Sequence, residues 1–182
     1  INILSPCVGV SGENCANNIA DQFFNNAKIK QLLVKRKPIL ILDNEDLVWA
    51  KQFIIDNKLD KFITMEYNSF SLDRKVVGGI WSLEYYQELI NKSKLPILWL
   101  AHDKAHKFNG GIDGRGISWR KSAALIKNSR LFIGCGSGLT MVAASSEVDK
   151  KIIEVNIGNT ISMTGCKYSN SICLSKQTPE TL

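Results

Sequence analysis

Strand-length apolar runs alternate with amphipathic stretches along most of this chain, and this alternation restricts the possible fold more than any other feature. The apolar runs are residues 38–42, 62–66, 96–101, 131–133 and 151–157. The amphipathic stretches between them are residues 44–57, 82–91, 118–128 and 139–146. Apolar strands separated by helices are typical of a parallel sheet that is covered on both faces. The pattern therefore predicts an α/β fold with a Rossmann-like parallel sheet.

Length and charge narrow the classes of protein that fit. A chain of 182 residues with 45% hydrophobic content can bury one good core, but it is too short for two full-sized Rossmann-type domains. The net charge of +6 favours an anionic ligand or peripheral contact with an anionic membrane. The lysines are dispersed and form no long basic run, so we expect no nucleic-acid partner.

Cysteine usage and the lack of export signals favour a cytoplasmic location. The five cysteines form no CxxC pair, which is typical of reduced thiols. No run reaches the about eighteen apolar residues of a membrane-spanning helix, and the first residues do not resemble a signal peptide. With only His102 and His106 as histidines, we expect no metal site and no cofactor. Because the chain begins at Ile1, we expect a fragment of a longer protein.

A glycine-rich turn follows the apolar run 131–133, in the sequence LFIGCGSGLTMVAAS. Glycines at 134, 136 and 138 lack a Cβ atom, which suits a sharp turn or the close approach of a ligand. We expect the amides of residues 137–140 to point outward, without partners, at the start of a helix, where phosphate commonly binds. The alternative is a turn that only connects a strand to a helix. The dinucleotide fingerprint GxGxxG does not fit, because Leu139 stands where its third glycine belongs.

A methyltransferase remains a second interpretation of this turn. The GCGSG segment resembles the first motif of S-adenosylmethionine-dependent enzymes, and Glu154 ends the next apolar run, about where their ribose-binding acid stands. Two features depart from that family. Phe132 occupies the position of its usual acid, and the motif comes late in the chain instead of opening the fold.

Two longer segments resemble the C-terminal nucleotide-binding half of GT-B glycosyltransferases, in particular the bacterial lipopolysaccharide heptosyltransferase family. The first segment is FITMEYNSFSLDRKVVGGIWSLEYYQELI, in which a loop with hydroxyl groups and a lysine precedes a tryptophan and a helix. The second is SAALIKNSRLFIGCGSGL, a helix followed by a strand and a serine-glycine turn. The resemblance spans residues 60–160. It implies two parts: a remnant of an N-terminal domain or a connecting segment at residues 1–58, and a nucleotide-sugar-binding Rossmann-like domain at residues 59–182.

The resemblance also implies a set of donor-binding residues. The phosphates of the nucleotide-sugar would contact Ser69, Ser71, Lys75, Ser137, Gly138, Leu139 and Thr140. Independently of the resemblance, the glycines and Asp113 of residues 108–119 favour a mobile loop at the carboxyl edge of the sheet, where Asp113 and Gly136 would contact the nucleoside. The alternative is a segment that only connects two elements. Gly136 replaces the family's usual acid and Met141 replaces a histidine, so the resemblance does not imply ADP-heptose as the donor.

The activity that follows from the resemblance is sugar transfer from a nucleotide-sugar to a bacterial surface glycan or glycolipid, as in lipopolysaccharide biosynthesis, without a metal. The protein would act in the cytoplasm or at the periphery of the inner membrane. The family takes its general base from a carboxylate of the N-terminal domain, and Glu13 is the candidate here. A methyltransferase-like enzyme and a non-catalytic nucleotide-binding α/β module are the alternatives.

Overall fold

A computed structural model describes residues 39–67, 81–135, 137–156 and 171–175 of the chain, with Asn156 and the last five as backbone only. Its helices are α2 (Asn44–Asp56), α3 (Leu83–Lys92), α4 (Trp119–Asn128) and α5 (Gly138–Ala143). Its strands are β1 (Ile63–Glu66), β2 (Ile97–Ala101), β3 (Ile112–Arg115), β4 (Leu131–Gly134), β5 (Ile152–Asn156) and β6 (Ser171–Ser175). No helix in these ranges is long and apolar enough to cross a membrane.

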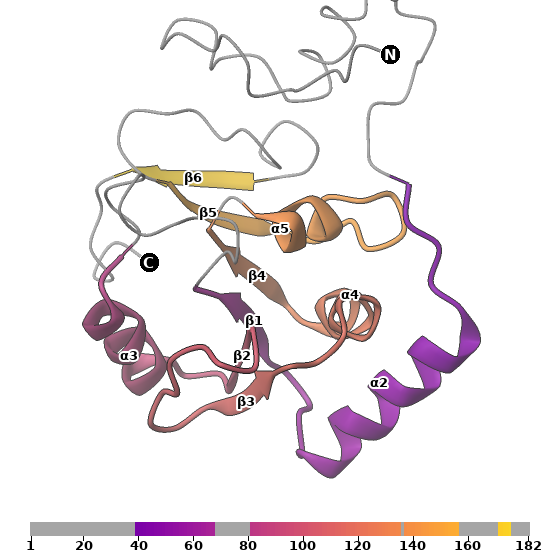
Figure 1. Cartoon of the computed structure of the whole chain (residues 1–182), viewed down its shortest axis with the longest axis horizontal. Helices are drawn as coiled ribbons and strands as arrows, with labels where there is room; N and C mark the ends of the chain where they lie inside the picture. The colour runs from indigo at the N-terminus through magenta and orange to yellow at the C-terminus, as the bar shows by residue number, and fades with distance from the viewer. Residues whose placement is uncertain (1–38, 68–80, 136, 157–170, 176–182) are drawn as a thin grey trace, which may run out of the picture.

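The six strands form one parallel sheet in the order β3-β2-β1-β4-β5-β6, which confirms the predicted α/β fold (Figure 1). The chain runs outward from β1 to β3, returns to β4 beside β1, and then runs outward in the opposite direction. The strand order therefore reverses between β1 and β4. In open α/β sheets, ligands bind at the carboxyl ends of the strands at such a switch point.

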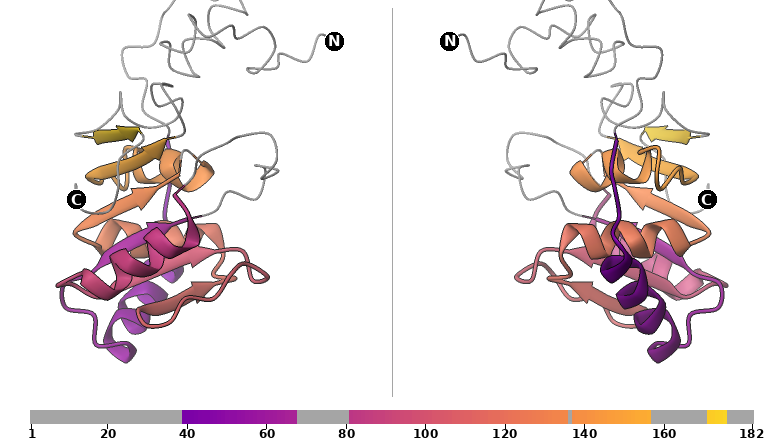
Figure 2. Two further views of the ribbon diagram at one scale, coloured as in Figure 1. Left: turned by 90° about the vertical axis from the view of Figure 1, so that its left-hand side faces the viewer. Right: turned by 90° about the vertical axis from the view of Figure 1, so that its right-hand side faces the viewer.

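Helices cover both faces of the sheet, with α2, α4 and α5 on one face and α3 on the other (Figures 1 and 2). Successive residues of a strand point to opposite faces, so each strand contributes to two cores. In β2, Leu98 and Leu100 belong to the core under α2, α4 and α5, whereas Ile97 and Trp99 belong to the core under α3. This double burial explains why the strand reads as a continuous apolar run.

Helix α2 is tied to α4 by an arginine clamp. The Asp43 side chain caps α2 by accepting a hydrogen bond from the Asp46 amide at 2.9 Å. Arg120 of α4 donates from Nε to Asp46 and from Nη2 to Asp43, each at 2.9 Å. Helix α2 therefore packs on the sheet domain although it lies on the N-terminal side of the boundary predicted at residue 58. That boundary stays a prediction, because residues 1–38 lie outside the described part of the chain.

Two sequence expectations about secondary structure are wrong. The described part of the apolar run 38–42 forms no strand, because only one side of it has a packing partner: Leu42 is buried, whereas Ile39 and Ile41 are 84% and 75% exposed. The stretch 108–119 was expected to be a loop, yet it contains β3. Among the described strands it pairs only with β2, and an edge strand with one neighbour does not need a continuous apolar run.

Candidate functional site

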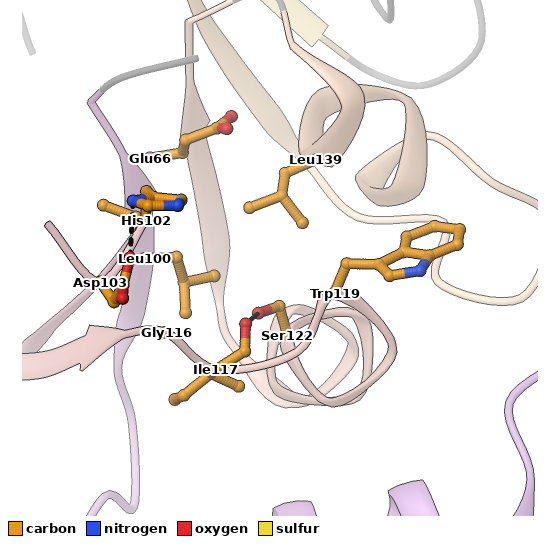
Figure 3. A pocket seen from close by; sticks show the side chains of 10 residues that line it. Glu66, Leu100, His102, Asp103, Gly116, Ile117, Trp119, Ser122 and Leu139 are labelled. Carbon is orange, nitrogen blue, oxygen red and sulfur yellow. Dashed lines mark hydrogen bonds and ion pairs between the residues drawn. The ribbon is translucent and has the colours of Figure 1, made fainter. Parts of the chain in front are cut away.

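A cavity of about 520 Å³ opens at the carboxyl ends of β1, β2 and β3, beside the switch point (Figure 3). Its walls come from the ends of these strands, from the turn after β3, from α4 and from the first turn of α5. The lining residues are Glu66, Leu100, Ala101, His102, Asp103, Gly116, Ile117, Trp119, Ser122 and Leu139. The parallel topology explains this gathering, because all strands of the sheet end at the same edge.

The cavity has apolar walls and a small number of polar groups, the composition typical of small-molecule sites. Leu100, Ile117 and Leu139 supply aliphatic surface. Trp119, the first residue of α4, is 58% exposed and offers an aromatic ring at the cavity wall. The polar groups include the Glu66 carboxyl and the pair of His102 and Asp103, whose Nδ1 and Oδ1 atoms are 2.7 Å apart.

Glu66 is the buried acid of the cavity. It is the last residue of β1, it is only 6% exposed, and it accepts a hydrogen bond from the Ser137 hydroxyl at the start of α5. Burial raises the pKa of Glu66 to about 7, against the opposing effect of hydrogen bonds from Ser137 and Cys135. This carboxyl group can therefore gain or lose a proton near neutral pH.

The glycine-rich turn caps its own helix, which corrects the expectation that its amides are unpaired. Ser137 Oγ accepts hydrogen bonds from the amides of Leu139 and Thr140, at 3.1 and 3.5 Å. In return, Thr140 Oγ1 accepts from the Ser137 amide at 3.4 Å, which completes a capping box. Gly138 is exposed, and a Cβ atom built there would meet no atom within 4 Å. Phosphate binding by residues 137–140 stays a prediction.

Gly134 is required for packing and not for the approach of a ligand. A Cβ atom at this position would lie 2.5 Å from Phe132 Cε1 and 2.5 Å from Thr140 Oγ1. The absence of a side chain therefore lets α5 sit directly on β4. This close contact places Ser137 within hydrogen-bond distance of Glu66.

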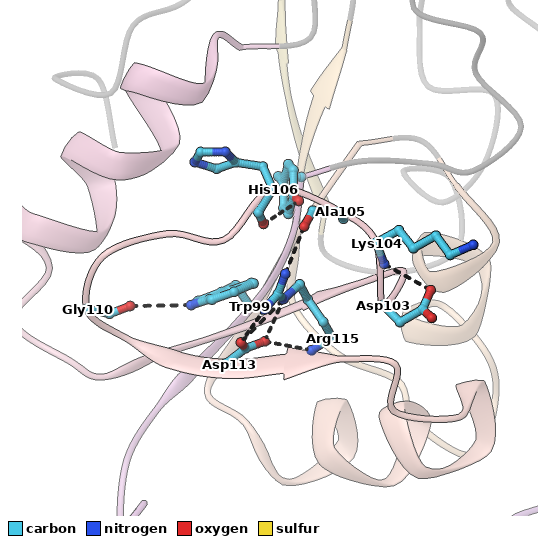
Figure 4. Close-up of polar contacts among 9 residues, drawn as sticks. Trp99, Asp103, Lys104, Ala105, His106, Gly110, Asp113 and Arg115 are labelled. Carbon is cyan, nitrogen blue, oxygen red and sulfur yellow. Dashed lines mark hydrogen bonds and ion pairs between the residues drawn. The ribbon is translucent and has the colours of Figure 1, made fainter.

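Asp113, expected to contact a nucleoside, is held by Arg115 in β3 (Figure 4). Arg115 donates to its carboxylate from Nε at 3.1 Å and from Nη2 at 2.9 Å, and this pairing lowers the pKa of Asp113. The Arg115 guanidinium also lies 5.4 Å from the ring centroid of Trp99. Asp113 is not among the described residues that line the cavity. The same segment of sequence reaches the cavity instead through Gly116, Ile117 and Trp119, and a nucleoside role for Asp113 stays a prediction.

Several predicted site residues cannot be placed. Glu13, Ser69, Ser71, Lys75 and Gly136 lie outside the described residues. Within the described ranges, no group of three or more His, Cys, Asp or Glu side chains is arranged to hold a metal ion.

The methyltransferase interpretation required Glu154 as a ribose-binding acid. Glu154 lies inside β5, with β4 on one side and β6 on the other, and its exposed fraction is 0%. A ribose cannot reach this carboxyl group. The position of Glu154 in the sheet therefore removes one of the two features that favoured a methyltransferase.

Sequence reasoning missed Glu66 and Trp119. Glu66 closes an apolar run, and Trp119 opens an amphipathic helix, so each reads as part of a secondary-structure element. The signal available for Glu66 was an acid at the carboxyl end of a buried strand, the position at which ligands of α/β sheets bind. That Trp119 lines the same cavity as the end of β1 follows only from the tertiary structure.

No protein-family model matches the sequence, and a search of curated proteins finds no match either. The structure is similar to the crystal structure of the glycosyl transferase family 9 protein from Veillonella parvula DSM 2008, with a TM-score of 0.69 and 13% sequence identity. The match covers 92% of this chain and 51% of that protein, so the chain spans about half of its length. At this identity the likeness concerns the fold. The chain is therefore similar in fold to about half of a glycosyl transferase family 9 protein.

Proposed function

We propose that this chain is the donor-binding part of a metal-independent glycosyltransferase and that it holds a nucleotide-sugar in the cavity between Glu66 and Trp119. The observation that supports this most is the position of the cavity, at the switch point of a sheet whose fold is similar to that of a glycosyl transferase family 9 protein. Its volume of about 520 Å³ lies within the range of pockets that hold small ligands.

The shape of the site suggests how a nucleotide-sugar lies in it. The nucleoside occupies the apolar part, between Trp119, Ile117 and Leu139, where an aromatic ring and aliphatic side chains suit a planar base. We place the diphosphate beside Gly138, an exposed residue at the start of α5, and propose Lys75 as a further contact. The net charge of +6 favours such an anionic ligand.

Glycosyl transfer places two chemical demands on the complete enzyme. Negative charge develops on the departing nucleoside diphosphate, and Lys75 together with main-chain amides would stabilise it. The acceptor hydroxyl needs a general base, for which Glu13 or a carboxylate of a preceding domain is proposed. The acceptor class that we propose is a bacterial surface glycan or glycolipid, reached from the cytoplasm at the periphery of the inner membrane.

A ligand panel tests this proposal. Nucleoside diphosphates, nucleotide-sugars and S-adenosylmethionine are titrated against the chain, with thermal unfolding and intrinsic tryptophan fluorescence as readouts. A ligand at one hundred times its Kd stabilises the folded state by about 2.7 kcal/mol, so a true donor gives a clear rise in Tm. A response to S-adenosylmethionine alone would favour a methyltransferase, and no response to any ligand would favour a non-catalytic module.

A matched pair of variants localises the binding. Leu139→Asp puts a negative charge into the cavity wall, whereas Val48→Asp makes the same change on α2 at a side chain that is 64% exposed. An acid in the first turn of α5 is favoured by the helix dipole, and Val48 is exposed on α2, so we expect both variants to fold. Because Leu139 also packs against the core, circular dichroism checks that its variant is folded before affinities are compared. Only Leu139→Asp is expected to lose nucleotide-sugar affinity. Equal affinity in the two variants would place the ligand elsewhere.

A further inference from the structure

The Ser137 hydroxyl has no free hydrogen-bonding capacity. A serine hydroxyl offers one proton and two lone pairs. In this structure the proton goes to the Glu66 carboxyl, while the amides of Leu139 and Thr140 donate to the oxygen. Ser137 can therefore donate to a ligand only when Glu66 gives up this hydrogen bond.

Glu66 has no cationic partner among the residues that the structure describes. The groups that face it are the Ser137 hydroxyl and the Cys135 thiol from the turn after β4. Tyr86 of α3 interacts with it electrostatically, and His102 and Asp103 line the same cavity. Within the described ranges, an ionised Glu66 is thus a buried negative charge that a hydroxyl and a thiol stabilise and that no Lys or Arg side chain neutralises.

A ligand that carries phosphate groups would bring further negative charge into this cavity. Two negative charges at close range in a buried site repel each other, and this repulsion raises the pKa of the carboxyl group. Protonation of Glu66 removes the repulsion. A protonated Glu66 carries no charge and has a hydrogen-bond donor of its own. The neutral acid does not repel a phosphate group beside it. It also leaves the Ser137 hydroxyl free to donate its hydrogen bond to a phosphate oxygen.

We infer that Glu66 couples the binding of an anionic ligand in this cavity to the uptake of one proton from solvent. In this reaction the Glu66 carboxylate becomes a carboxylic acid as the ligand enters, and the proton returns to solvent as the ligand leaves. The inference rests on the proposed function for the identity of the anion, which is a nucleotide-sugar. The pKa of about 7 that burial gives Glu66 keeps this proton exchange accessible at neutral pH.

The test compares nucleotide-sugar affinity at pH 6.5 and pH 8.5 in the wild type, Glu66→Gln and His102→Gln. A nucleotide-sugar is the right probe because its diphosphate is esterified at both ends and does not titrate in this interval. Linkage predicts that the wild type binds about 25-fold more weakly at the higher pH. Glu66→Gln, which is neutral at both values, should bind with nearly constant affinity. His102→Gln, which removes the imidazole of the cavity wall but keeps Glu66, should retain the fall.

A second measurement does not depend on the variants folding. Titration of the wild type at pH 7 in buffers of different ionisation enthalpy reports the protons taken up, and about half a proton per ligand is expected. Zero uptake, or the same fall in affinity in Glu66→Gln as in the wild type, would overturn the inference while leaving the proposed function intact. No binding of any nucleotide-sugar at either pH would overturn the proposed function and this inference together.

Discussion

The contact between α5 and β4 gives the sharpest test of how the site is built. Replacing Gly134 by alanine puts a methyl group 2.5 Å from the Phe132 ring and 2.5 Å from Thr140 Oγ1. Both distances are shorter than real Cβ atoms tolerate, so α5 must move away from the strand. The Thr140 hydroxyl that would be displaced belongs to the capping box with Ser137, so the start of the helix is disturbed as well.

The size of the effect follows from these contacts. Inserting one carbon into a well-packed core costs about 1 to 3 kcal/mol, and two simultaneous overlaps favour the upper part of that range. For a chain of this length, a loss of about 2 to 3 kcal/mol lowers Tm by about 4 to 12 °C. Urea denaturation followed by circular dichroism should show the same loss as a lower midpoint with an unchanged slope.

Gly138→Ala is the matched control, since it makes the same chemical change four residues later. Its Cβ atom enters open space, and alanine is the better helix former by up to about 1 kcal/mol. We therefore expect unchanged or slightly higher stability. Equal losses in the two variants would refute the view that Gly134 is selected by packing. A stable Gly134→Ala protein would refute the close approach of α5 to β4.

Three further predictions concern single side chains. The Tyr86 hydroxyl is buried without a hydrogen-bond partner in the described part of the chain, so Tyr86→Phe should leave the free energy of unfolding unchanged or raise it by up to about 1 kcal/mol. Tyr67→Phe removes a 2.7 Å hydrogen bond to a main-chain carbonyl and should lower the free energy of unfolding by about 1 kcal/mol. A larger loss in Tyr86→Phe than in Tyr67→Phe would contradict this. Because the pKa of Glu66 rises on folding from 4.5 to about 7, the folded state holds an extra proton between these values, and stability should fall as pH rises through this window, by on the order of 3 kcal/mol. Urea titrations at several pH values should show this slope in the wild type and not in Glu66→Gln. Arg120 forms an ion pair with Asp46, and the Arg120 side chain is 41% exposed. A double-mutant cycle with alanine at both positions should therefore give a coupling energy of about 0.5 to 1 kcal/mol. A coupling energy near zero would mean that the clamp does not hold α2.

The sequence alone predicted the α/β class and most of the secondary structure. Buried parallel strands and amphipathic helices leave periodic signals that are local, so the core strand β2 and the helix α3 were recognisable from the residues themselves. The edge strand β3 escaped because its sequence IDGR has no apolar run. The run 38–42 was wrongly predicted to be a strand, because an apolar composition does not show whether a neighbouring strand is present to pair with it.

The candidate site was only partly accessible from the sequence. The glycine-rich turn was recognised as the start of a helix, but the state of its amides depends on where the side chains of Ser137 and Thr140 point. Glu66 is separated from Ser137 by 71 positions, and no local pattern relates the two. They meet because β4 pairs with β1, a choice of neighbour that is made by the folding of the whole sheet.

The sequence by itself thus determined which segments become strands and helices, because hydrophobic periodicity acts over a few residues. Only the tertiary structure decided the strand order, the position of the cavity and the burial of an acid beside a capping serine. These features depend on contacts between distant segments, and the free energy of such contacts depends on their surroundings in three dimensions. The pKa of Glu66 illustrates the difference, since an ordinary glutamate becomes a group that titrates near neutrality when the fold removes it from water.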